Sequence, residues 1–272
     1  MTEARAGRER GLIAAWQAVV VITVLGLWEI GTRIPWLVQN TFLDPFFISR
    51  PSLIASRLWF WATARGQQSL WPHLAATLWA TFLGFIVGVG SGFAAGLLLG
   101  QSRRAAAIAR PFIVALNSLP RIALVPLITM LFGLGLLSKV VMAWFIVFFA
   151  VFFNTYKGAL SIETDVLNFC RTLGGTERQL TWTVRIPTAL AWTFASLPIA
   201  VGFSLIGVVI AEFVGSSTGL GYIMIVSLST LNATDMFVAL VVLGGVGVLL
   251  VWFIEKVERR LLHWTPEFQN RL

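Results

Sequence analysis

The stretch "GFIVGVGSGFAAGLLLG" (residues 84–100) decides the fold class, because it carries no charge and repeats glycine at every fourth position. The repeating glycines are Gly84, Gly88, Gly92, Gly96 and Gly100. Residues four apart share one face of a helix, so these glycines form a narrow stripe. Inside a membrane, small residues at this spacing let a second helix backbone approach closely. The stretch therefore predicts a transmembrane helix that packs tightly against a neighbouring helix.

The composition of the whole chain agrees with this prediction. Of its 272 residues 57% are hydrophobic and only 12% are charged, whereas a soluble domain has about twice that share of charge. These values predict an all-α membrane protein with a single transmembrane domain over residues 1–272. A net charge of +8 can indicate a nucleic-acid partner. Here, however, the basic residues cluster between apolar runs, which is the pattern that orients membrane helices in lipid, so we expect no nucleic acid.

Six apolar segments are long enough to cross about 30 Å of hydrocarbon at about 1.5 Å per residue. They span residues 12–30, 74–99, 111–131, 136–156, 189–213 and 236–254. No small-x-small cleavage site follows the first segment, so we expect it to be an uncleaved span. The third segment is the least regular because it contains Pro111, Pro120 and Pro126.

The distribution of Lys and Arg predicts the orientation of these spans. Most of the 20 basic residues fall in the segments that are cytoplasmic when the N-terminus is inside, and the 215–234 loop has none. The long 31–73 loop holds arginines, but long loops count less in this rule. We therefore expect both termini, and the polar stretch between the fourth and fifth spans, to be cytoplasmic.

That polar stretch, residues 163–187, predicts two short helices. Asp165 suits the positive end of the first helix, and Gly174 with Gly175 is expected to end it, because glycine readily adopts a left-handed conformation. Asn168 faces away from the apolar side of this helix. The apolar side consists of Val166, Leu167, Phe169, Cys170 and Leu173. Such a helix either lies on the lipid surface or docks on a soluble partner.

The second short helix has clear start and stop signals. Thr176 followed by Gln179 is typical of a capping box. Ile186 and Pro187 are expected to end the helix, since the residue before a proline avoids the helical region.

The spacing of this stretch resembles the EAA loop of permease subunits of binding-protein-dependent ABC importers. In that loop E-A-A, three residues, Gly, nine residues and I-x-L-P follow one another. Here Asn168-Phe169-Cys170 replaces E-A-A, Gly174 follows after three residues, and Val184-Arg185-Ile186-Pro187 after nine more. Residues 75–265 also resemble the branch that serves nitrate, sulfonates and taurine, through "LGFIVGVGSGFAAGLLLGQSR", "SLPRIALVPLITMLFGLGLLSKV", "AEFVGSSTGLGYIM" and "VERRLLHW".

The resemblance implies a type I importer permease fold in the bacterial inner membrane. It implies that a coupling helix within residues 163–187 docks on a dimeric ABC ATPase. The coupling residues that it implies are Asp165, Asn168, Phe169, Cys170, Gly174, Ile186 and Pro187. It further implies a second permease chain, expected to be identical, and a periplasmic or lipid-anchored binding protein. The complex would work by alternating access, with the ATP and Mg²⁺ on the ATPase.

The chain itself shows no nucleotide, metal or catalytic site in its sequence. None of its lysines (Lys139, Lys157 and Lys256) follows a glycine, so a phosphate-binding G-x-x-x-x-G-K-[ST] loop is absent. We therefore expect a non-catalytic permease subunit without a cofactor or metal of its own. The expected substrate is a small anion such as a sulfonate, taurine or nitrate; a thiamine precursor, riboflavin or an aromatic acid is the alternative. An ion-coupled secondary transporter, another class, should show related halves and midplane carboxylates.

Two ionisable residues inside the predicted spans suggest a pathway or gate. Arg121 lies about 16 Å beyond Arg110 at helical rise, directly after Pro120. A charge at that depth is costly, so it invites a functional explanation. Arg121 either attracts an anionic substrate or forms an internal ion pair or gate element, with Glu212 as one possible partner. Glu212 precedes a glycine- and serine-rich loop that shapes a gate, contacts the binding protein or is simply a local turn.

Overall fold

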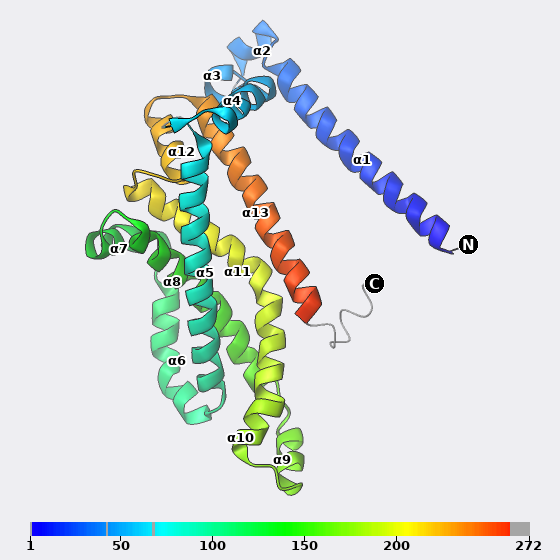
Figure 1. Cartoon of the computed structure of the whole chain (residues 1–272), viewed down its shortest axis with the longest axis vertical. Helices are drawn as coiled ribbons and strands as arrows, with labels where there is room; N and C mark the ends of the chain where they lie inside the picture. Colours follow the sequence, from blue (N-terminus) through cyan, green and yellow to red (C-terminus); the bar gives the residue numbers. More distant parts are fainter. Residues whose placement is uncertain (1, 42, 67–68, 262–272) are drawn as a thin grey trace. The chain divides into compact units, whose positions relative to one another are not determined.

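The computed structural model describes residues 2–41, 43–66 and 69–261, and this part of the chain is helical without any strand. Within these residues, five helices are long and apolar enough to cross a membrane (Figure 1). They are α1 (Thr2–Gly31), α5 (Leu70–Gly100), α8 (Leu136–Leu160), α11 (Ile186–Gly215) and α13 (Ala233–Leu261). The C-terminal residues beyond Leu261, which we expect to be cytoplasmic, lie outside the described residues.

The third predicted span, residues 111–131, lies in a broken helix, in keeping with the irregularity expected from its prolines. The chain forms α6 (Arg103–Ser118), a 3-10 turn η2 (Arg121–Leu124) and α7 (Val125–Phe132). The two parts are bent by 84°. Leu119 has an extended backbone (φ −64°, ψ 132°), because the following Pro120 disfavours the helical region for the residue before it. Together the two parts count as one broken span or a re-entrant loop.

The remaining helices are short. Three of them, in the loop after α1, begin with a proline, which is favoured in the first helical turn because its missing N–H has no partner there anyway. These three are α2 (Pro35–Asn40), α3 (Pro45–Ile48) and α4 (Pro51–Thr63). The others are α9 (Thr164–Thr172), α10 (Glu177–Leu180), the π-helical turn η3 (Thr181–Arg185) and α12 (Leu220–Ser229).

The chain divides into two compact units, and the first contains residues 1–70 and 223–241. Within this unit the Glu29 carboxylate accepts hydrogen bonds from the backbone N–H and the hydroxyl of Ser52, at 3.0 and 2.9 Å. Arg57 of α4 donates two hydrogen bonds to Asp235, at 2.6 and 3.0 Å, and this contact raises the pKa of Arg57. Asp235 also lies in the first turn of α13. Polar contacts therefore fix α1, α4 and the start of α13 to one another.

The second unit contains residues 71–222 and 242–272, and here the glycine stripe of α5 faces α8. A Cβ atom added at Gly92 would lie 2.8 Å from the carbonyl oxygen of Phe148. At Gly96 it would lie 2.8 Å from the carbonyl oxygen of Phe152. Gly84, Gly88 and Gly100 likewise meet side chains of α8, at Ala143, Val147 and Ala159. The stripe thus brings the two helix backbones close together.

Helix α8 also packs against α11, and the two helices are antiparallel. Thr155 and Thr193 share a hydrogen bond of 2.7 Å. Farther along, a Cβ added at Gly207 would lie 3.0 Å from Ala143 Cα, and Lys139 reaches Glu212. One buried cluster between α5, α8 and α11 contains Phe85, Val147, Val151, Leu197, Ala200 and Val201.

Candidate functional site

The first of the two helices predicted between α8 and α11 is present as α9, and a glycine turn ends it. Asp165 lies in the first turn of α9. Gly174 has φ +85°, its N–H bonds to the carbonyl of Arg171 at 2.9 Å, and Gly175 N–H bonds to the carbonyl of Cys170 at 3.0 Å. These two bonds are those of a Schellman motif, which satisfies the last carbonyls of the helix and requires the left-handed residue that glycine supplies.

The apolar residues of α9 do not all face the same environment. Phe169 is 64% exposed and Leu173 is 73% exposed, and Val166 beside them is exposed too. Cys170 is only partly exposed and lines, with Leu173, a groove of about 350 Å³ that extends to Leu180. The exposed side chains form an apolar stripe at helical spacing, available to a partner surface.

The second helix of this segment starts as predicted but does not end as predicted. Thr176 and Gln179 form the capping box. The prediction that Ile186 and Pro187 end this helix was wrong, because α10, η3 and α11 form one continuous helical element from Glu177 to Gly215. Pro187 lies in the first turn of α11, directly after the π-helical turn, whose wider hydrogen-bond pattern accommodates the missing N–H.

An ion-pair triad joins the two short helices. Glu177 of α10 pairs with Arg171 of α9 at 2.8 Å and with Arg185 of η3 at 3.0 Å. The carboxylate therefore bridges the end of α9 to the base of the long helix. Exposed ion pairs of this kind contribute little stability individually, but this one spans the glycine turn and links the two short helices.

The structure does not bring Arg121 and Glu212 together, so that possible pairing was wrong. Arg121 begins η2 directly after Pro120 and donates a hydrogen bond of 2.9 Å to Asn117. Elsewhere in the broken span, Arg110 of α6 lines a cavity of about 290 Å³ together with the rings of Phe152, Phe153 and Tyr156. A guanidinium beside aromatic rings suits a small anion with an apolar part.

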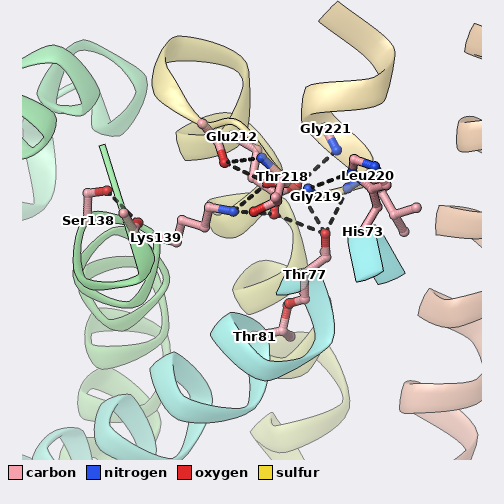
Figure 2. Close-up of polar contacts among 12 residues, drawn as sticks. His73, Thr77, Thr81, Ser138, Lys139, Glu212, Thr218, Gly219, Leu220 and Gly221 are labelled. Atoms are coloured by element: carbon pink, nitrogen blue, oxygen red, sulfur yellow. Dashed lines mark hydrogen bonds and ion pairs between the residues drawn. The ribbon is translucent and has the colours of Figure 1, made fainter. Parts of the chain in front are cut away.

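Glu212 instead pairs with Lys139, a residue that sequence reasoning did not assign to any site. Their charged atoms lie 3.0 Å apart, and the side chains are 0% and 4% exposed. Thr77 of α5 donates to both carboxylate oxygens, at 3.0 and 3.1 Å, and Gly221 N–H donates at 2.9 Å. Figure 2 shows these groups converging on the carboxylate from α5, α8 and the chain that follows α11. A buried charge pair requires such added hydrogen bonds to offset its lost hydration.

The loop of residues 216–219, which follows α11, is bound into the same group. Lys139 donates to the carbonyl oxygen of Thr218 at 2.6 Å, and Leu220 N–H donates to the Thr77 hydroxyl at 2.9 Å. Gly219 N–H donates to Nδ1 of His73 at 3.2 Å (Figure 2). Gly219 has φ +126°, and a Cβ there would collide with the Glu212 carboxylate. We call Thr77, Lys139, Glu212 and this loop the Glu212 cluster.

No group of three His, Cys, Asp or Glu side chains within residues 2–41, 43–66 and 69–261 is arranged to hold a metal ion. The Glu212 cluster contains one carboxylate and one ammonium, which satisfy each other. The cluster therefore links α5, α8 and α11 through a buried ion pair.

Comparison with known proteins identifies relatives over most of the chain. The family model described as "Binding-protein-dependent transport system inner membrane component" matches residues 84–263. A protein of Haemophilus influenzae named "Probable ABC transporter permease protein" is 35% identical over 71% of this chain and 79% of its own length. The formylaminopyrimidine transport permease protein of Halalkalibacterium halodurans is 29% identical, over 89% and 93% of the two chains. The taurine transport system permease protein of Escherichia coli is also 29% identical, over 84% and 83%.

A solved structure supports the fold. The inward-facing MetNI methionine ABC transporter matches with a TM-score of 0.60 at 23% identity, over 73% of this chain and 98% of the matched chain. At this identity the likeness shows the fold and nothing of the ligand.

Proposed function

The chain belongs to the family of binding-protein-dependent transport system inner membrane components, and we propose that it couples an external ATPase to a transmembrane substrate pathway through α9. It is a multi-pass permease subunit of an ABC importer in the bacterial inner membrane, with the type I importer permease fold. The resemblance seen in the sequence to the sulfonate and taurine branch is confirmed by its relatives.

The observation that carries the coupling proposal is the geometry around Gly174. Helix α9 ends in a Schellman motif there and leaves Phe169 and Leu173 exposed as an apolar stripe. An exposed apolar stripe on a short helix fits a groove on a partner protein, because burial of its side chains then contributes favourably. In our account Asp165, Asn168 and Cys170 flank this stripe in the ATPase contact.

We further propose that this chain is non-catalytic and that ATP and Mg²⁺ bind to the partner ATPase dimer. The energy then reaches this chain mechanically. Because α10, η3 and α11 are continuous from Glu177 to Gly215, movement of the docked segment acts directly on a membrane-spanning helix, with Ile186 and Pro187 near its base. Two identical permease chains and one binding protein complete the proposed importer, which works by alternating access.

For the substrate we propose a small anion, with a sulfonate or taurine first. The taurine permease of Escherichia coli is a relative over 84% of this chain, and Arg110 and Arg121 place cations in and near the broken span. A second candidate is a thiamine precursor, favoured by the relative named for formylaminopyrimidine transport, which covers 89% of this chain.

The test is uptake by proteoliposomes that contain this chain, its ATPase and its binding protein. We expect labelled taurine to accumulate only with ATP, Mg²⁺ and all three components present. Uptake of formylaminopyrimidine in place of taurine would favour the second substrate. Uptake driven by an ion gradient without the ATPase would contradict the importer mechanism and favour a secondary transporter.

A further inference from the structure

The proposed ATPase-docking segment consists of α9 and α10. The Glu212 cluster lies at the opposite end of the long helical element that begins with α10. The continuous element from Glu177 to Gly215 has 39 residues, which is about 58 Å at helical rise. Pro198 lies within it, but Leu197 and Ala200 pack there in the same core cluster as Val147 and Val151 of α8. The helix is thus braced where a proline would otherwise let it bend.

At the Glu212 end, one carboxylate holds groups from separate parts of the chain. Lys139 belongs to α8, Thr77 to α5, and Gly221 follows the loop of residues 216–219. Lys139 and Thr77 each make a second bond to that loop region, at Thr218 and Leu220. The loop region is therefore bound to α5, α8 and α11 through side chains, and not only through the peptide chain that leaves α11.

We propose that Lys139, Thr77 and Glu212 are positioning residues of the transport cycle, which make the loop of residues 216–219 follow the movement of α11. The inference rests on the proposed function of α9 and α10 as the ATPase-docking segment. When the bonds of the Glu212 cluster are intact, displacement at Glu177 reaches the loop of residues 216–219. The loop is then the moving part of a gate at the Glu212 end of α11. When these bonds are broken, the ATPase still docks, but its cycle no longer moves the loop.

Lys139→Met is the sharpest variant, because it removes the cation and the bond to Thr218 while keeping a long unbranched side chain only one atom shorter. Glu212 then keeps its bonds to Thr77 and Gly221 but loses its counter-charge, which is strongly unfavourable for a buried carboxylate. The double variant Lys139→Met/Glu212→Gln removes both charges and leaves an amide oxygen to accept from Thr77. It is expected to recover part of the function, since removing both partners avoids a lone buried charge.

Thr81→Val is the matched control. Thr81 is buried one turn along α5 from Thr77, but its hydroxyl donates only to the carbonyl of Thr77 in its own helix. Thr77→Val is the corresponding test variant, because it removes the bonds to Glu212 and to Leu220 together.

The first measurement is the ratio of taurine uptake to ATP hydrolysis in proteoliposomes of the complete complex. Lys139→Met is expected to lower this ratio about tenfold, which is within the usual range of a coupling effect, while hydrolysis stays near the wild-type rate. Thr81→Val should leave it unchanged. A purely structural role would lower uptake and hydrolysis in the same proportion, and that result would overturn the proposal.

The second measurement does not depend on the ATPase or on the choice of substrate. A spin label on Ser217→Cys, in a Cys170→Ser background, reports the mobility of the loop, since Ser217 is exposed. The label is expected to be more mobile in Lys139→Met than in the parent. Equal mobility in both proteins would show that Lys139 does not hold the loop and would overturn the proposal. A clear mobility difference together with absence of uptake by the wild-type complex would count against the proposed function alone.

Discussion

Addition of one methyl group at Gly92 is expected to destabilise the protein measurably. The new Cβ would lie 2.8 Å from the carbonyl oxygen of Phe148, 3.1 Å from Val151 Cβ and 3.2 Å from the backbone nitrogen of Phe152. Two of these are backbone atoms of α8 and cannot rotate away, so the two helices must separate. Overpacking of this kind costs about 1–3 kcal/mol; at about 2 kcal/mol the ratio of folded to unfolded protein falls roughly 30-fold.

The matched control is Gly90→Ala, two positions away on the same helix, where nothing lies within 4 Å of the added Cβ. Unfolding of both purified variants in detergent micelles, followed by tryptophan fluorescence against increasing SDS, measures the difference. We expect Gly92→Ala to unfold at clearly lower SDS than wild type. Gly90→Ala should unfold at the same SDS concentration as wild type or a higher one, because alanine is the better helix former. Equal midpoints for the two variants would refute close packing of α5 on α8.

Three further predictions concern the docking segment and the broken span. Gly174→Ala should weaken capture of the ATPase, because a left-handed alanine costs about 1–2 kcal/mol, whereas Gly174→Asn should weaken it less; equal capture by both would contradict the role of backbone conformation. Thr176→Ala should destabilise the second short helix by about 1 kcal/mol through loss of its cap, seen as faster amide exchange over residues 177–180, and unchanged exchange would contradict the capping box. Arg121→Gln should reduce uptake of taurine without changing ATPase capture, and normal uptake would remove Arg121 from the substrate pathway.

Features set by local spacing could be predicted from the sequence. The glycine stripe, the capping box at Thr176 and Gln179 and the end of α9 at Gly174 all depend on residues within a few positions of one another. The prolines of the third segment marked it as irregular. The size of its bend could not be predicted, because it depends on how the chain after Pro120 packs in three dimensions.

The Glu212 cluster could not be predicted, because its members are far apart in the chain. Lys139 and Glu212 are separated by 73 positions and Thr77 and Glu212 by 135, and no local pattern connects them. A signal was nevertheless present: Lys139 is a lone cation in one apolar segment and Glu212 a lone anion in another. Opposite charges buried in separate spans are expected to pair, which makes such residues worth testing as partners.

Capture of the ATPase by this chain is the direct test of the proposal that α9 is the coupling helix. The purified permease would be compared with Gly174→Pro and with Gly133→Pro, since both glycines have open surroundings and left-handed backbones, at φ +85° and +80°. Proline cannot adopt that conformation, so both variants disturb a turn but only Gly174 belongs to the docking segment. We expect wild type and Gly133→Pro to capture the ATPase and folded Gly174→Pro not to capture it. Full capture by Gly174→Pro would show that α9 is not the coupling helix.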